Sequence, residues 1–90
     1  MAIGNIEVGS YRNLTASANV QSVSGAMIGF YVCSTTSGTI QFYDSATTTT
    51  TTPISGLITP EIGMNYFPIC FANGLYAVIG GTLNVTISYV

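Results

Sequence analysis

The side chains that could carry out acid–base, nucleophilic or metal chemistry are few and scattered. They are Glu7, Asp44, Glu61, Cys33 and Cys70, and the chain has no histidine and no lysine. General acid–base catalysis needs a positioned pair of groups, and each carboxylate stands alone in the sequence. Zinc needs more ligands than two cysteines, and calcium needs an acidic cluster. We therefore expect no enzymatic activity, no cofactor and no metal site.

Asp44 and the two cysteines have simpler structural interpretations. Asp44 follows a predicted strand and precedes Ser45, a pattern typical of an Asx turn that caps the following loop. Cys33 and Cys70 each lie in an apolar run, at residues 30–33 and 67–71. Free cysteine behaves as a small hydrophobic residue, so we expect reduced thiols buried in the core. A single disulfide between the two cysteines is the alternative.

The composition limits what the protein can bind. The chain has 90 residues, of which 48% are hydrophobic and only 4% charged, with a formal net charge of −2. A single arginine, Arg12, cannot neutralise a row of phosphates or anchor a polybasic segment, so nucleic-acid and membrane partners are not expected. The chain is too hydrophobic to be disordered and short enough to form one domain. No basic, apolar leader precedes it, so we expect synthesis in the cytoplasm.

The pattern of apolar and polar residues predicts strands and almost no helix. Alternation puts Ile40 and Phe42 on the inward face of one strand and Phe67, Ile69 and Phe71 on one face of another. It is clearest in the last strand, where Leu83, Val85, Ile87 and Tyr89 alternate with polar residues. Turns are expected at residues 34–38, 73–74 and 80–81, the first and last as hairpin connections. The prolines at positions 53, 60 and 68 mark strands at an edge of the sheet. The result is an all-β, single antiparallel β-sandwich or jelly-roll-like domain of seven to eight strands. The expected strands cover residues 14–21, 27–33, 39–43, 53–60, 64–71, 75–79 and 82–90.

Residues 47–52 are six consecutive threonines, with no apolar residue to anchor them. Their β-branched side chains favour an extended backbone, so this tract is expected to be an exposed, extended loop.

Several features favour assembly with other subunits. A weakly charged surface with free strand edges is a liability unless another chain covers it. Residues 27–33 are apolar on both faces, as expected for a strand that is covered on two sides. We divide the chain into an N-terminal arm, residues 1–10, and a sandwich domain, residues 11–90. The candidate interface residues are Ile3, Ile6 and Val8 of the arm, together with Tyr11, Arg12, Tyr43 and Tyr76.

Four segments carry a resemblance to a known group of proteins: residues 37–44, 67–68, 73–76 and 80–89. They resemble small β-sandwich structural proteins of tailed bacteriophages, of the head decoration or cement type. The resemblance covers residues 25–90 and rests mainly on turn and strand residues. It implies a homotrimer on the outer surface of the virion capsid that binds the major capsid protein and stabilises contacts between its subunits.

A phage fibre or knob subunit, or a carbohydrate-binding β-sandwich module, is the alternative function. Outward tyrosines such as Tyr43 and Tyr76 can stack on a sugar ring as well as anchor a protein interface. A carbohydrate-binding module predicts saturable glycan binding, whereas a cement protein predicts binding to capsids.

Overall fold

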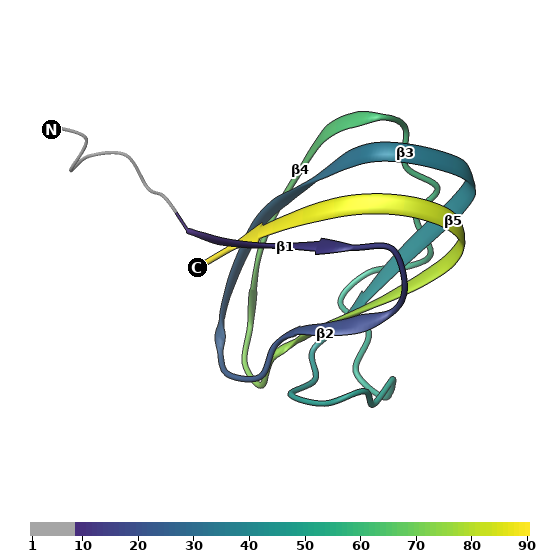
Figure 1. The fold of residues 1–90 in the computed structure, drawn as a ribbon. Coiled ribbons are helices and arrows are strands. Elements are labelled where there is room, and N and C mark those ends of the chain that lie inside the picture. The colour runs from purple at the N-terminus through teal and green to yellow at the C-terminus, as the bar shows by residue number, and fades with distance from the viewer. Residues whose placement is uncertain (1–8) are drawn as a thin grey trace, which may run out of the picture.

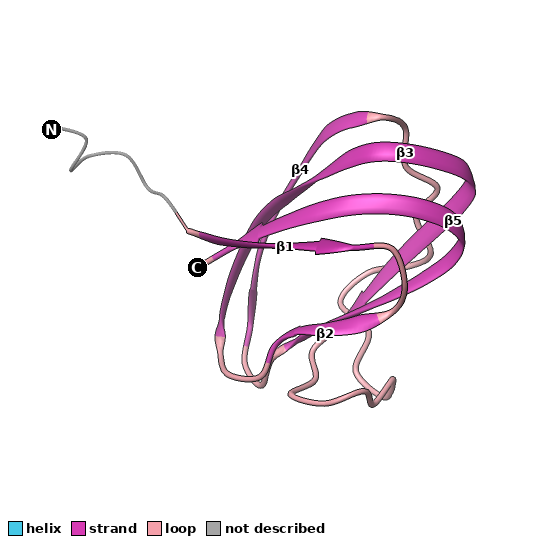
Figure 2. Cartoon of the chain, viewed as in Figure 1, coloured by secondary structure: helices cyan, strands magenta, loops and turns pink. Residues whose placement is uncertain are grey.

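The computed structural model describes residues 9–90, and all regular structure within them is β (Figures 1 and 2). The strands form one antiparallel sheet in the order β1-β5-β3-β4, and β2 also pairs with β5. The prediction of an all-β antiparallel domain is confirmed. The strands are β1 (Ser10–Leu14), β2 (Ala18–Gln21), β3 (Gly25–Tyr43), β4 (Gly63–Phe71) and β5 (Leu75–Tyr89).

The described residues contain five strands, where the sequence predicted seven or eight, because β3 and β5 are long and continuous. β3 has 19 residues and β5 has 15. The hairpin loop predicted at residues 34–38 and the hairpin turn at 80–81 are wrong, since both segments lie inside strands. They face each other across the β3–β5 pair, where Thr36 pairs with Thr82 and Thr39 with Gly80.

The two misassigned segments bend the β3–β5 pair instead of ending it. Ser37 has φ 55° and Gly81 has φ 68°, both in the left-handed region, and the register shifts between Thr36 and Thr39. An extra residue in one strand bends the ribbon and increases its twist. Gly38 donates its N–H to Thr35 Oγ1 at 3.1 Å, which pairs one backbone group freed by the irregularity.

The bend folds the sheet over on itself. One half consists of β1, the end of β5, the start of β3, and β4; the other consists of β2, the start of β5 and the end of β3. Phe30 and Phe42 lie twelve positions apart in β3, which in a straight strand is about 40 Å. Their ring centroids are 5.4 Å apart, so the two halves pack face to face (Figure 1).

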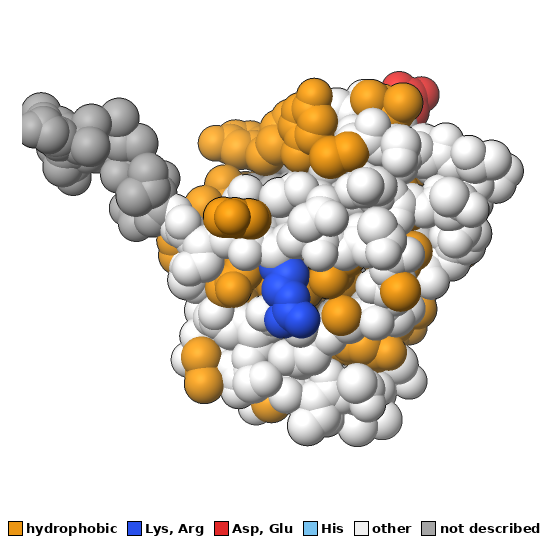
Figure 3. All heavy atoms as spheres, in the orientation of Figure 1, with side chains coloured by type: hydrophobic (Ala, Val, Ile, Leu, Met, Phe, Trp, Pro, Cys, Tyr) orange, Lys and Arg blue, Asp and Glu red, His pale blue; other side chains and the backbone are white. Residues whose placement is uncertain are grey.

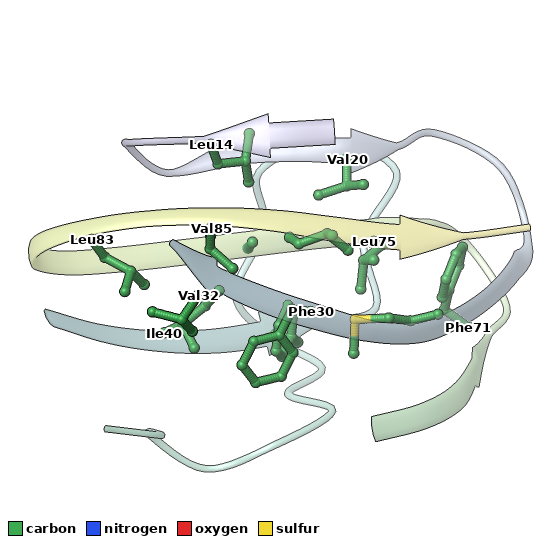
Figure 4. Close-up of a cluster of buried hydrophobic side chains, with 13 residues drawn as sticks. Leu14, Val20, Phe30, Val32, Ile40, Phe71, Leu75, Leu83 and Val85 are labelled. Atoms are coloured by element: carbon green, nitrogen blue, oxygen red, sulfur yellow. The ribbon is translucent and has the colours of Figure 1, made fainter. Parts of the chain in front are cut away.

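The hydrophobic core fills the space between the two halves (Figure 4). Its centre is Phe42, whose ring also lies 6.1 Å from that of Phe67 in β4. The predicted alternation in the last strand is confirmed, and so is the inward position of Ile40 and Phe42. The fully buried large side chains are Met27, Phe30, Val32, Ile40, Phe42, Leu75, Leu83, Val85 and Ile87.

Some strand boundaries differ from the prediction. Residues 14–21 form the end of β1 and the whole of β2, with a break between them that leaves Ala16 exposed. Residues 53–60 contribute two isolated bridges, from Pro53 to Tyr43 and from Ile58 to Ile40, in place of the predicted strand. Pro68 lies in β4, at the edge of the strand order and where the β3–β4 register shifts, as the sequence predicted. The turn predicted at residues 73–74 is confirmed between β4 and β5.

The threonine tract is exposed, as predicted, but it is not extended. The chain bends over residues 46–48, and Asp44 N–H donates to Thr52 O at 2.9 Å, which closes the loop. Ser45 is buried, and its Oγ accepts N–H groups from Thr47 and Thr49, each at 3.1 Å. The serine that precedes the tract therefore anchors it, which a count of apolar residues does not reveal.

Replacing Gly81 by alanine should destabilise the fold by about 1–3 kcal/mol, because alanine is strained at positive φ. The new Cβ would also collide with Ser37 O. Urea unfolding should show a lower midpoint with an unchanged slope. The matched control is Gly56→Ala, since a Cβ at Gly56 meets no atom within 4 Å. Equal stability of the two variants would contradict the role assigned to the bend.

Candidate interaction surface

The carboxylates predicted from sequence do not form a catalytic group. Glu7 lies outside the described residues, and Glu61 is exposed just before β4. Within residues 9–90, no three His, Cys, Asp or Glu side chains lie close enough to hold a metal ion. The same part of the chain encloses no pocket. None of the described residues forms a helix long and apolar enough to cross a membrane.

Asp44 caps a turn, but not the one that the sequence predicted. Its carboxylate accepts N–H groups from Ala72 at 2.9 Å, Asn73 at 2.8 Å and Gly74 at 3.3 Å, all in the connection between β4 and β5. The loop that follows Asp44 is capped by Ser45 instead. Hydrogen bonds to the charged form, above all from the backbone N–H groups of Ala72 and Asn73, lower the pKa of Asp44. Desolvation by burial opposes this shift, and the Gly74 N–H adds to it.

Both cysteines are exposed, so the prediction of buried thiols is wrong. Their neighbours Val32 and Phe71 point into the core, and the strand alternation then turns Cys33 and Cys70 outward. Cys70 pairs with Ala26, seven positions before Cys33 along β3. That separation is roughly 20 Å, whereas a disulfide needs Cα atoms within about 7 Å. The thiols are free, and the alternative of a disulfide within the chain does not fit this fold.

The predicted interface residues are not brought to one surface. Ile3, Ile6 and Val8 lie outside the described residues. Tyr43 and Tyr76 are half-buried cross-strand partners, and their ring centroids are 6.2 Å apart. Tyr11 is 74% exposed on β1, and Arg12 donates from Nη1 to Asn19 O at 3.1 Å. The lone cation thus bonds to the backbone of β2 in the same chain.

Three of the large exposed hydrophobic side chains within residues 9–90 lie together on one face of the β3–β4 pair, which we call the β3–β4 outer face. Tyr66 is 77% exposed, Met64 51% and Tyr31 49%. Met64 lies opposite Tyr31, and Tyr66 opposite Gly29. A space-filling view shows hydrophobic side chains gathered over β4 and the adjoining part of β3 (Figure 3). The residues of this face are Ile28, Tyr31, Met64, Tyr66, Pro68 and Cys70.

Strand alternation explains why this face is left uncovered. Phe67, Ile69 and Phe71 of β4 lie on one face of the strand, as predicted from the sequence, and that face packs against the core, so the residues between them must point away. In β3, Phe30 and Val32 fill the core and Tyr31 points outward. An antiparallel sheet with one solvated face normally has polar residues on that face. The β3–β4 pair instead has apolar residues on both faces.

The same side of the sheet becomes polar where it continues onto β5 and β1. Thr86 pairs with Tyr31 on one side and with Asn13 on the other. Asn13 Nδ2 donates to Asn84 Oδ1 at 2.8 Å and to Thr86 Oγ1 at 3.0 Å. This side of the sheet is therefore divided into an apolar half on β3–β4 and a hydrogen-bonded polar half on β5–β1.

Tyr31, Met64 and Tyr66 were not predicted from the sequence as residues of an interaction surface. Part of the signal was present, because residues 27–33 are apolar on both faces and predict a strand that is covered twice. The even-numbered residues of β4 carry the same signal, with Met64, Tyr66, Pro68 and Cys70 alternating with the inward set. The missing information was that β3 and β4 are neighbours, which places the two outward sets side by side.

No protein-family model, no curated protein and no solved structure matches this chain. The fold and the β3–β4 outer face are therefore the findings from which function must be argued.

Replacing Asp44 by asparagine should lower the free energy of unfolding at pH 7 by about 1–2 kcal/mol, because the charge-assisted bonds to three backbone N–H groups are weakened. The stabilisation from the carboxylate is complete above the ordinary Asp pKa of about 3.9, and it is lost as pH falls through the lowered pKa of the folded state. The difference between wild type and D44N should therefore shrink as the pH falls below about 4.

Urea titrations at several pH values measure this effect. Glu61→Gln is the control, because the exposed Glu61 carboxylate bonds to none of residues 9–90, and it should leave stability within about 0.5 kcal/mol. A difference between wild type and D44N that does not depend on pH would contradict the role of the Asp44 charge.

Proposed function

We propose that the protein is a virion structural protein, a decoration or cement protein that binds the outside of a phage head. In this proposal it contacts the major capsid protein, stabilises contacts between capsid subunits, and has no catalytic role. The observation that carries the proposal is the β3–β4 outer face, an exposed apolar surface on a chain in which 4% of the residues are charged. Large exposed apolar patches mark contacts with other macromolecules.

Charge supports contact with protein over contact with nucleic acid or anionic lipid. The chain has one cation, Arg12, and that side chain bonds to Asn19 O. Binding to phosphates needs several Lys or Arg side chains, because each neutralised phosphate adds to affinity. We therefore exclude nucleic acid and membrane from the proposed partners.

The segments that resemble phage decoration proteins lie mainly in the bent β3–β5 pair. Residues 37–44 cover the end of β3 and residues 80–89 cover most of β5, while residues 73–76 include the turn before β5. The resemblance thus falls on the part of the chain that folds the sheet over on itself. The sandwich or jelly-roll-like form, the homotrimer and the position on the outer capsid surface are parts of this proposal.

A carbohydrate-binding module or a fibre subunit is the second candidate. The exposed rings of Tyr31 and Tyr66 on one sheet face favour it, because an aromatic ring with a polar tip can stack on a sugar. The neighbouring amides Asn13 and Asn84 are already hydrogen-bonded, to each other. We favour the protein contact because sugar hydroxyls need strong hydrogen-bonding partners. The side chains of Met64 and Cys70 offer only weak ones, and that of Pro68 offers none.

The purified protein should bind, in a saturable manner, to heads of the phage whose genome encodes it, when these are prepared without the protein. A variant lacking residues 1–8 should lose this binding and keep its melting temperature, because β1 begins at Ser10 and its pairing with β5 is retained. Cosedimentation measures the binding, and circular dichroism measures the fold.

Three outcomes would contradict the proposal. Immunogold labelling on fibres and not on heads would support the second candidate, as would saturable glycan binding that competes with heads. A gene located outside any phage or prophage would refute the decoration function. Unchanged head binding by the truncated variant would refute the docking role predicted for the N-terminal arm and leave the head contact to residues 9–90.

A further inference from the structure

We propose that the β3–β4 outer face is the surface on which a second copy of this chain packs, face to face. This inference shares only the expectation of self-assembly with the proposed function, because the same face on two copies forms a two-fold pair, which replaces the homotrimer of that proposal. It is argued from burial, charge and strand pairing, and it can be tested without capsids.

The face has the size and composition of the centre of an interface. Tyr66 is 77% exposed and Tyr31 49%, and since a tyrosine side chain covers about 200 Å², these two residues alone present roughly 250 Å², to which the half-exposed Met64 adds. A standard interface buries about 800 Å² on each partner, and its apolar centre is surrounded by a polar rim. The neighbouring polar half, with Asn13, Asn84 and Thr86, supplies such a rim.

The surface is also even enough for sheet packing. Gly29 lies opposite Tyr66, and a Cβ at Gly29 would lie 2.9 Å from Met64 Cε. The methionine side chain therefore occupies the space that the glycine leaves open. Two sheets can pack face to face about 10 Å apart when their inner side chains interdigitate. A second copy offers a face with the same pleat and the same dimensions.

Two copies of this chain meet no charge repulsion on this face. None of the six residues on the face is charged, and the polar half consists of hydroxyl and amide groups. Two copies can therefore approach without like-charge repulsion, and nothing on the face selects a partner of opposite charge. A protein partner that relied on electrostatic complementarity would find no group to recognise here.

The contact should use the face and not the strand edge. Pro68 has no N–H group, and it lies in β4, the strand at the end of the strand order, where the register with β3 shifts. Proline in an edge strand removes a donor that an added strand would need. The edge is thus protected from pairing with another chain, while the apolar face beside it is not covered.

The experiment compares Tyr66→Glu with Tyr11→Glu across a dilution series. Both tyrosines are about three-quarters exposed on the same side of the sheet, but Tyr11 is on β1, at the far side of the polar half. Each variant adds one negative charge at a position where most of the side chain is already in solvent. Light scattering in the presence of a reductant measures the mass and excludes disulfide-linked species, since both thiols are exposed.

Wild type and Y11E should have masses above the 9.4 kDa of one chain. The dissociation constant of self-association should be at least 10-fold higher for Y66E than for wild type. Alkylation of Cys70 should slow with increasing concentration in wild type and not in Y66E. At concentrations low enough for both variants to be monomeric, circular dichroism should show the same melting temperature for the two.

A monomeric wild type at all concentrations would overturn the inference, as would dissociation caused by Y11E and not by Y66E. If wild type is monomeric and Y66E no longer binds heads, the face belongs to the contact with the capsid. If wild type is monomeric and Y66E no longer binds glycans, the face belongs to a sugar site. A dimer lost in Y66E would support the face-to-face contact and contradict the homotrimer. A wild-type protein that self-associates through this face but does not bind heads would contradict only the proposed function.

Discussion

The pairing of β3 with β5 through a bend is the constraint on which the rest of the structure depends. If the two strands were straight, Phe30 and Phe42 would lie far apart and no enclosed core would form. The left-handed residues Ser37 and Gly81 allow both strands to turn together without breaking the ladder, because the pairing resumes at Thr39 and Gly80. A fold with long, non-local pairing must bring distant segments together before the core forms, so the bend is both a structural and a folding requirement.

This architecture has enough strands to cover one side of its sheet but not the other. Folding the sheet on itself buries most of one side, where Phe67, Ile69 and Tyr89 are partly buried against the core between the halves. The opposite side of β3–β4 has no layer to cover it, yet its residues have the apolar character of an inner layer. A polar substitution at each of these positions would cost the monomer little, because the side chains do not reach the core. The apolar outer face is therefore explained by contact with another molecule better than by the stability of the single chain.

The sequence predicted the class of fold and the inward residues of most strands, because alternation is a local property. Leu83, Val85 and Ile87 could be assigned to the core from their spacing alone. The strand count could not be predicted in the same way, since Ser-Gly and Gly-Gly pairs permit a left-handed residue in a hairpin and in a bulge alike. The prediction that the cysteines are buried was wrong for a related reason, because a run that is apolar on both faces does not show which face is inward. The outer face required knowing that β3 and β4 are neighbours, which depends on long-range pairing.

The way in which the protein uses its few charges bears on how it can bind. Two of the charged side chains within residues 9–90 form hydrogen bonds to the backbone. Asp44 accepts from three N–H groups of the β4–β5 turn, and Arg12 donates to the backbone oxygen of Asn19. Both charges serve the fold of the chain itself, so they contribute little to steering a partner from a distance. Binding must then depend on short-range contact, through apolar area and hydroxyl or amide hydrogen bonds. Such contact is only weakly affected by ionic strength, in contrast to recognition based on charge. A surface of this kind suits subunits that are held beside each other at high local concentration in an assembly, where close fit matters more than long-range attraction.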